Sequence, residues 1–167
     1  MDEELAAALR RVCPYRLVVD ADVRQLLQEV TLQVAETGAT LFAEGDPTNG
    51  VAAVLEGHID VCKQGRTLAT LGSGSVLGEL SLFLPAARRT ATAIARSPVR
   101  LVLWPAADLP ARLNAHERLA TAIVADLAHV LADRLERRTQ DVVELLDVAG
   151  RRLPLSDLER LRRRAVE

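Results

Sequence analysis

GSGSVLGELSLFLPAARRTATA, residues 72–93, is the stretch around which the rest of the chain can be placed. It opens with a glycine and serine turn over 72–75, and two apolar residues follow. The next segment, Gly78-Glu79-Leu80-Ser81, indicates the start of a single helical turn. A helix start presents free backbone N–H groups and a partial positive charge, so it suits an anion. The stretch therefore predicts an anion-binding site.

Two charged residues complete this predicted site. Arg89 lies ten residues after Glu79 and precedes Thr90-Ala91-Thr92, whose alternation predicts a strand. A guanidinium beside free N–H groups would complete a phosphate cradle. Glu79 has the wrong sign for phosphate, but a carboxylate accepts strongly from a sugar hydroxyl. The two residues together predict a phosphorylated sugar as the ligand.

The order of these residues resembles the phosphate-binding cassette of the cyclic nucleotide-binding domain family. The resemblance implies that Glu79 binds the ribose 2′-hydroxyl and that Arg89 pairs with the cyclic phosphate. Backbone N–H groups of the short helix, near Gly78, Leu80 and Ser81, would finish the cradle. It also implies that Thr90 reaches the phosphate or a guanine edge, and that apolar side chains contact the ligand, namely Val61, Leu68 and Leu77.

The spacing of ten between Glu79 and Arg89 is similar to that of the bacterial cyclic-AMP receptor branch. Arg88 offers the spacing of nine found in several eukaryotic members, but only Arg89 is followed by the matching Thr-Ala-Thr. The alternative is a degenerate cassette that is kept for its fold. Members that bind no nucleotide usually lose the Glu or the Arg, whereas both are present here, so we expect binding.

Composition excludes several classes of function. The 167 residues are 49% hydrophobic and 26% charged, which is typical of a globular domain with its own core. A net charge of −2 gives no general attraction to nucleic acid or anionic membranes, and aromatic side chains for stacking on single strands are scarce. No apolar run is long enough to span a bilayer and the acidic start is unlike a signal peptide, so we expect a cytoplasmic protein without membrane contact. The cysteines and histidines lack metal-ligand spacing, so we predict no metal and no cofactor apart from the regulatory ligand, cAMP or cGMP.

The periodicity predicts an α+β fold: an antiparallel β-roll, similar to a jelly roll, flanked by N-terminal helices and a long C-terminal helix. Residues 1–30 would form two helices on the roll, over 5–12, ended by Pro14, and from Asp20, a capping residue, to about Glu29. Residues 31–104 would form the roll, with the cassette at 77–92. Its expected strands lie at 31–34, 41, 51–55, 59–61, 67–71, 90–95 and 99–103. Ala52 and Ala53 depart from the family, since many members carry an aromatic residue there.

Residues 105–149 read as a short helix over 106–113 and a long helix from about His116 to Val148. An apolar stripe runs along the whole of the long helix, so we expect the roll to cover its first half and a partner helix its second. The resemblance implies a homodimer through this helix. It also implies a lid over the base, which matching Arg134-Leu135 to the family places at Arg138 and Thr139.

Residues 150–167 form a basic tail with a cluster of arginines at 160, 162, 163 and 164. The tail either docks on an acidic partner or nucleic acid, or is the solvated face of a helix, which we favour. Only 16 residues follow Arg151, too few for a helix-turn-helix, so we expect no direct DNA binding.

The leading hypothesis is a cyclic nucleotide sensor that signals through its long helix to a separate effector protein. The alternative is a ligand-free dimeric adaptor or scaffold that retains the fold. No nucleophile, base and orienting group can be assembled from the sequence, so we do not expect an enzyme. The choice among cAMP, cGMP and a cyclic dinucleotide stays open, because Thr90 tolerates more than one base.

Overall fold

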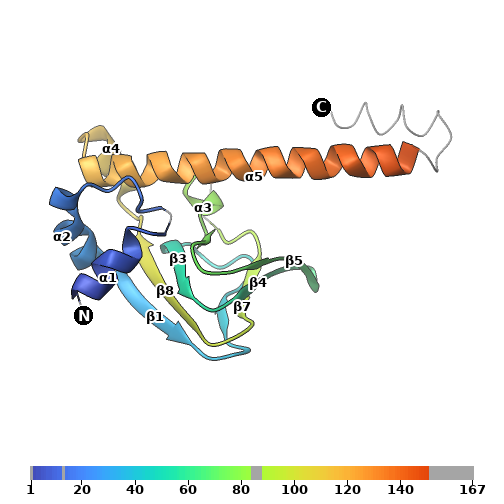
Figure 1. Cartoon of the computed structure of the whole chain (residues 1–167), viewed down its shortest axis with the longest axis horizontal. Helices are drawn as coiled ribbons and strands as arrows, with labels where there is room; N and C mark the ends of the chain where they lie inside the picture. Colours follow the sequence, from blue (N-terminus) through green and yellow to red (C-terminus); the bar gives the residue numbers. More distant parts are fainter. Residues whose placement is uncertain (1, 13, 84–87, 151–167) are drawn as a thin grey trace. The chain divides into compact units, whose positions relative to one another are not determined.

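The computed structural model describes residues 2–12, 14–83 and 88–150, and the strands within them form two antiparallel four-stranded sheets. The first sheet has the order β1-β8-β3-β6, with bounds Thr31–Ala35, Val99–Pro105, Gly50–Glu56 and Val76–Leu77. The second has the order β2-β7-β4-β5, with bounds Thr40–Phe42, Thr92–Ala95, Ile59–Lys63 and Arg66–Leu71. The sheets curve around a common interior (Figure 1), which confirms the predicted β-roll.

The interior between the sheets holds the core of the roll. Val54, Ile59 and Leu101 are almost fully buried there. Alanines fill much of the remaining space, with Ala52, Ala93 and Ala95 in the buried cluster and Ala35 and Ala39 packed against it. Small side chains fill less apolar volume in the interior than larger residues would.

Turn chemistry explains why the strands end where they do. Gln64 and Gly65 both have positive φ, +50° and +74°, which are the values that a tight two-residue hairpin requires. They join β4 to β5 with Lys63 opposite Arg66. The strands expected over 59–61 and 67–71 therefore form a hairpin that turns at this dipeptide.

Several elements differ from their sequence-based expectation. The short helix expected over 106–113 spans Leu109–Asn114, and the short strand Val76–Leu77 is not among the expected strands. The first helix, α1, spans Asp2–Leu9, because the chain tightens to i→i−3 hydrogen bonds at Arg11 and Val12 before Pro14. The second helix, α2, spans Asp20–Glu29, and its N-cap is Val19 rather than the expected Asp20. Asp20 is instead the first helical residue, where its negative charge interacts favourably with the partial positive charge of the helix N-terminus. β7 starts at Thr92, two residues later than expected, because the chain at Arg89 pairs instead with the loop over 43–46.

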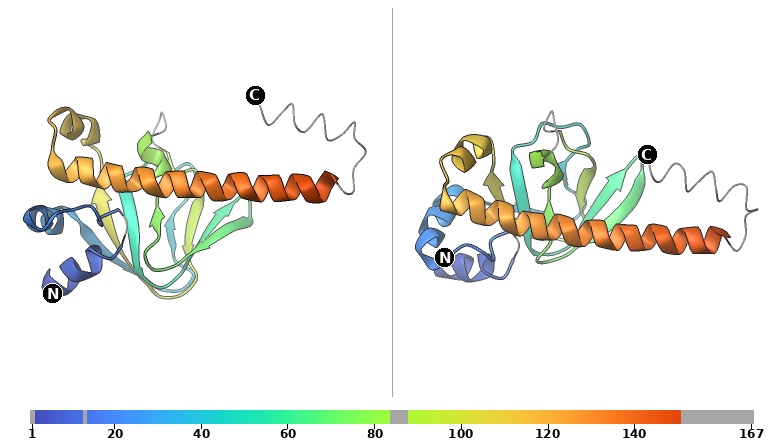
Figure 2. Two further views of the ribbon diagram at one scale, coloured as in Figure 1. Left: turned by 45° about the horizontal axis from the view of Figure 1, so that its top comes forward. Right: turned by 90° about the horizontal axis from the view of Figure 1, so that it is seen from above.

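The N-terminal helices meet α4 (Leu109–Asn114) and the first turns of α5 (Arg118–Gly150) at one end of the roll (Figures 1 and 2). Arg112 of α4 is the centre of this junction. Its guanidinium donates to both carboxylate oxygens of Glu29 at 2.9 Å and to Glu117, and it lies over the ring of Trp104. These bonds raise the pKa of Arg112 and lower that of Glu117, so both groups stay charged at neutral pH.

A second ion pair joins the segment between α1 and α2 to α5. Asp126 is 1% exposed, and its carboxylate accepts from the backbone N–H of Arg16 at 3.1 Å and from Nη2 of the same residue at 2.7 Å. One buried carboxylate thus satisfies a main-chain donor and a guanidinium together.

Replacing Asp126 by alanine should lower the free energy of unfolding by about 2 kcal/mol, because the N–H of Arg16 and the guanidinium lose their acceptor. Urea denaturation followed by circular dichroism measures the change. Asp22→Ala is the matched control: it also removes an aspartate paired with an arginine, but Arg118 is 70% exposed, so it should cost less than about 1 kcal/mol. Equal losses in the two variants would contradict this assignment.

The chain divides into two units, residues 1–127 and the residues from 128 onward. In the second unit α5 continues to Gly150 and carries several exposed apolar side chains, Leu135, Val142, Val143 and Leu145. Within the described part of the chain, no helix has the length and apolar character that crossing a bilayer demands.

Candidate nucleotide-binding site

The predicted helical turn is present directly after β6. Gly78 follows the strand with φ of +83°, and α3 spans Leu80–Phe83. The N–H of Leu82 bonds back to the carbonyl of Glu79 at 3.0 Å and closes the turn. Ser81 lies inside this helix. The cassette backbone therefore has the local form that its glycine and its apolar residues predicted.

Arg89 is held at this turn by its main chain and by its side chain. Its N–H and its carbonyl bond to Asp46 and Gly45, each at 2.8 Å. Nη1 donates to the carbonyl of Gly50 at 3.1 Å, and Nη2 donates to Oδ1 of Asn49 at 2.7 Å. The loop before β3 therefore fixes the guanidinium.

The environment of this guanidinium is partly apolar. The residue is 4% exposed, and the guanidinium lies 4.3 Å from the centre of the Phe42 ring. Burial lowers the pKa of Arg89, while the carboxylates of Asp46 and Glu79 act in the opposite direction. Nε is buried and has no hydrogen-bond partner within the described residues. The side-chain acceptor of this buried cation, Asn49, is uncharged. The guanidinium can therefore still form a stronger, charge-assisted hydrogen bond with an anionic oxygen.

Gly78 is the residue that makes room for this arrangement. A Cβ added at Gly78 would overlap Nη1 of Arg89. The glycine is therefore required by the close approach of the guanidinium as well as by its positive φ.

Substituting Gly78 by alanine should destabilise the domain more than substituting Gly74, by at least about 1 kcal/mol. Both glycines have φ of +83°, so the backbone penalty of about 1–2 kcal/mol is shared. A Cβ added at Gly74 would meet no atom within 4 Å, whereas one at Gly78 would have to displace Arg89. Thermal and urea unfolding of the two variants measure the difference, and equal destabilisation would show that Arg89 does not need this space.

The remaining cassette residues lie near Arg89 with different exposure. Glu79 is 4% exposed and close enough for its charge to act on Arg89. Leu80 is 42% exposed, and Thr90 is half-buried beside Arg89. Arg88 is exposed and donates to the carbonyl of Gly45 at 2.7 Å. Of the two neighbouring arginines, Arg89 is the one buried at the turn.

The apolar residues named from the resemblance fall into two groups. Leu77 is buried on β6 and lines the same cavity as Arg89. Val61 and Leu68 lie on the paired strands β4 and β5, where Leu68 is 53% exposed and Val61 is half-buried. Their contact with a ligand stays a prediction.

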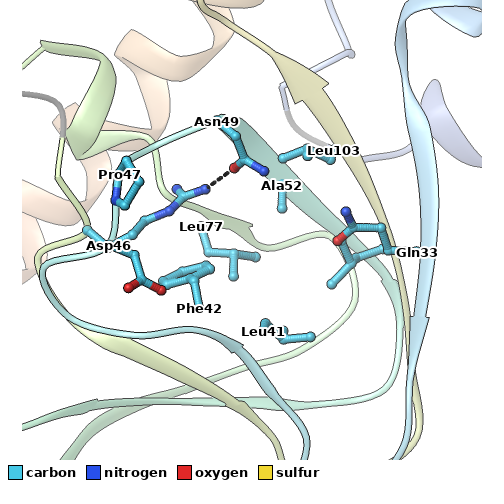
Figure 3. A pocket seen from close by; sticks show the side chains of 11 residues that line it. Gln33, Leu41, Phe42, Asp46, Pro47, Asn49, Ala52, Leu77 and Leu103 are labelled. Carbon is cyan, nitrogen blue, oxygen red and sulfur yellow. Dashed lines mark hydrogen bonds between the residues drawn. The ribbon is translucent and has the colours of Figure 1, made fainter.

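A cavity of about 330 Å³ opens into the roll beside Arg89 (Figure 3). Apolar side chains form its walls, namely Leu41, Phe42, Ala52, Leu77, Leu101 and Leu103. Gln33, Asp46, Pro47 and Asn49 also line it. Leu77 and Arg89 are the predicted site residues among its lining.

Arg138 and Thr139, the predicted base lid, lie on α5 in the second unit. Their polar groups bond locally, Arg138 to Asp141 at 3.2 Å and the hydroxyl of Thr139 to the carbonyl of Leu135 at 2.8 Å. Their role over a base stays a prediction. The basic tail, 150–167, lies outside the described residues apart from Gly150.

Sequence reasoning missed the partners of Arg89. The segment from Phe42 to Gly50 is rich in residues that favour turns, and this pattern alone predicts no role for the segment in the site. The structure shows that Asn49 and Gly50 accept from the guanidinium and that Phe42 packs against it. Partner choice across 40 residues of chain depends on the fold, and no local pattern signals it.

Comparison with known proteins decides the family. Residues 32–116 match the family model described as the cyclic nucleotide-binding domain. The chain belongs to that family. The match covers the roll, the cassette and α4, so the buried Arg89 and Glu79 lie inside the matched segment.

Several known proteins are similar to this cyclic nucleotide-binding domain. A Pycsar effector protein, PaPycTIR of Pseudomonas aeruginosa, is 29% identical over 72% of the chain and 38% of its own length. A CRP-like cAMP-activated global transcriptional regulator of Mycobacterium tuberculosis is 31% identical over 68% of the chain and 52% of its own length. The chain thus spans about half the length of these relatives or less.

Among solved structures, the N-terminal domain of a transcriptional regulator from Streptomyces coelicolor is similar along most of its length. It has a TM-score of 0.59 and 34% identity, and the match covers 81% of this chain and 93% of that domain. The similarity in structure therefore extends beyond the cassette to the whole roll.

Proposed function

We propose that this cyclic nucleotide-binding domain is a regulatory sensor that binds cAMP or cGMP and passes the bound state to a separate partner through α5. The observation that carries the proposal is the buried Arg89, which is fixed beside Glu79 and Gly78 and retains an unpartnered Nε among the described residues. A guanidinium in this state gains more from an anionic phosphate oxygen than from the neutral carbonyl and amide oxygens that it contacts here.

Each cassette residue then has a chemical role. Arg89 binds the cyclic phosphate, together with backbone N–H groups near Gly78, Leu80 and Ser81. Glu79 accepts from the ribose 2′-hydroxyl, and Thr90 contacts the phosphate or the base edge. Val61, Leu68 and Leu77 would contact the apolar faces of the nucleotide.

The relatives support regulation as the outcome of binding. The Mycobacterium tuberculosis protein is named as cAMP-activated, which favours cAMP as the first ligand to test. The Pseudomonas aeruginosa protein is named as an effector, which fits a nucleotide signal that controls an activity outside the binding domain. Cyclic GMP and a cyclic dinucleotide are the competing ligands.

Calorimetric titration of nucleotide-free protein with cAMP and then cGMP tests the proposal. We expect binding that Arg89→Ala weakens at least about 100-fold, because the variant loses charge-assisted hydrogen bonds to the phosphate. Arg88→Ala is the matched control: it removes the neighbouring arginine, which is exposed and bonds to Gly45, and should retain the affinity of the wild type.

The same titration separates the sensor from the ligand-free adaptor. No heat and no shift in melting temperature with cAMP, cGMP or a cyclic dinucleotide would overturn the sensor and favour the adaptor. Loss of binding in Arg88→Ala but not in Arg89→Ala would show that Arg88, nine residues after Glu79, binds the phosphate.

Signal transfer requires that nucleotide favours one state of α5 over another. We assign this role to Arg138 and Thr139, whose guanidinium and hydroxyl suit stacking on a base and reading its edge. In the structure these groups bond within α5, so recruitment to a base would exchange local bonds for contacts with the ligand.

The second unit favours a homodimer. Leu135 and Leu145 are 70% and 67% exposed, and Val142 lies between them at helical spacing. Apolar residues repeated along one helix face are stabilised when a partner helix covers them. We propose that a second copy of the chain supplies that helix.

Leu145→Lys should shift the protein from dimer to monomer, because it places a charge in the proposed interface. Glu144→Lys is the matched control, since it introduces the same side chain at the adjacent exposed position. Sedimentation equilibrium measures the mass of both variants and of the wild type. A monomeric wild type, or an unchanged dimer in Leu145→Lys, would contradict the interface.

A further inference from the structure

The part of α5 that lies in the second unit carries a heptad repeat. In a heptad written abcdefg, the positions that face a partner helix are a and d. Three of these residues, Leu135, Val142 and Leu145, are large, apolar and exposed. We call the a and d positions from 128 to 145 the seam, and they are Ala128, Leu131, Leu135, Arg138, Val142 and Leu145.

Arg138 is the charged residue of the seam, at a d position. In a parallel dimer each d residue meets its own copy, so two guanidinium groups would face each other inside the interface and oppose association. In an antiparallel dimer a d position meets an a position, so Arg138 can lie beside Leu135 of the second copy. Its aliphatic stem then packs on that leucine, while the charged end reaches out of the seam and stays available for the proposed contact with a base.

The charges that flank the seam also distinguish the two orientations. Arg134 and Asp141 occupy successive g positions. In a parallel dimer a g position meets an e position of the partner helix. Arg134 would then meet Thr139 of the second copy, and Asp141 would meet Leu146. A parallel dimer therefore leaves both charges without an opposite charge across the interface.

In an antiparallel dimer the g positions meet one another. When Leu135 lies opposite Arg138 of the second copy, Arg134 lies opposite Asp141, and the two-fold symmetry repeats this pair. Sliding one helix by a heptad places either Asp141 opposite Asp141 or Arg134 opposite Arg134. One antiparallel register therefore pairs opposite charges twice, whereas both neighbouring registers oppose like charges.

The two g residues can be reached by a partner helix. Asp141 accepts from Arg138 of its own helix at 3.2 Å, but both of these side chains are more than half exposed. Such an exposed pair contributes little by itself, so the carboxylate can be shared with a partner. Arg134 is half-buried and keeps part of its surface open to solvent.

We infer that the α5 helices of two copies pair antiparallel, with seam on seam and with two reciprocal ion pairs between Arg134 and Asp141. The inference rests on the proposed homodimer and adds its orientation and register. The two-fold axis passes between Glu136 and Arg137. The far ends of the two α5 helices therefore lie apart, and an effector that recognises them meets two separate surfaces.

Distances between spin labels on the full chain test the orientation by double electron–electron resonance. The natural cysteines are first removed by Cys13→Ser and Cys62→Ser. One label per chain is then attached through Gln140→Cys or Asp147→Cys, which are exposed f positions. In the antiparallel dimer, like labels are offset along the helix axis by about 10 Å at position 140 and by about 30 Å at position 147. The measured distance should therefore be at least about 10 Å longer at 147 than at 140, whereas a parallel dimer gives equal distances.

Charge reversal tests the ion pairs in a chain that keeps its cysteines. Arg134→Glu places a carboxylate opposite Asp141 twice per dimer, and should weaken the dimer at least about tenfold in sedimentation equilibrium. Adding Asp141→Arg to this variant restores opposite charges and should bring the dissociation constant back to within about threefold of the wild type. Arg137→Glu is the matched control, because it makes the same change at an exposed position outside the seam and should dimerise like the wild type.

Equal label distances at the two positions would overturn the antiparallel register and leave the homodimer standing. So would a double variant that dimerises no better than Arg134→Glu. A monomeric wild type would overturn both the register and the homodimer, and would assign the seam to a different partner. These experiments contain no nucleotide, so absence of cAMP and cGMP binding would contradict the proposed sensor alone.

Discussion

The buried guanidinium of Arg89 is the constraint on which the arrangement of this domain depends. A charge that is 4% exposed must be compensated inside the protein, and the roll supplies that compensation from several segments. Asn49 and Gly50 accept its protons, Phe42 covers its face, and Gly78 leaves it space. These contacts tie the loop before β3 to the cassette.

The incomplete satisfaction of Arg89 links this constraint to binding. Its Nε lacks a partner among the described residues, although the other guanidinium nitrogens are bonded. A buried N–H group without an acceptor lowers the stability of the fold. A ligand that supplies the missing acceptor would explain why such a group is present. The same group faces the cassette glycine and lines the cavity of the roll.

Two clusters of ion pairs hold the start of α5 in the first unit. Arg112 joins Glu29 and Glu117 beside Trp104, and Asp126 binds the backbone and side chain of Arg16. The N-terminal helices thereby anchor α4 and the first turns of α5 firmly to the roll. Beyond residue 127 the helix belongs to a separate unit with exposed leucines.

The residue pattern alone predicted the family motif and the β-roll. Those features are local, because glycine conformations, apolar alternation and the Glu79-to-Arg89 spacing are set by neighbouring residues. Three other features became clear only in the folded protein: β1 and β2 join different sheets, Asn49 and Gly50 hold Arg89, and Ala52 borders a cavity. Each of these depends on packing between segments distant in the chain, where the shape of both partners matters and no single stretch contains the information.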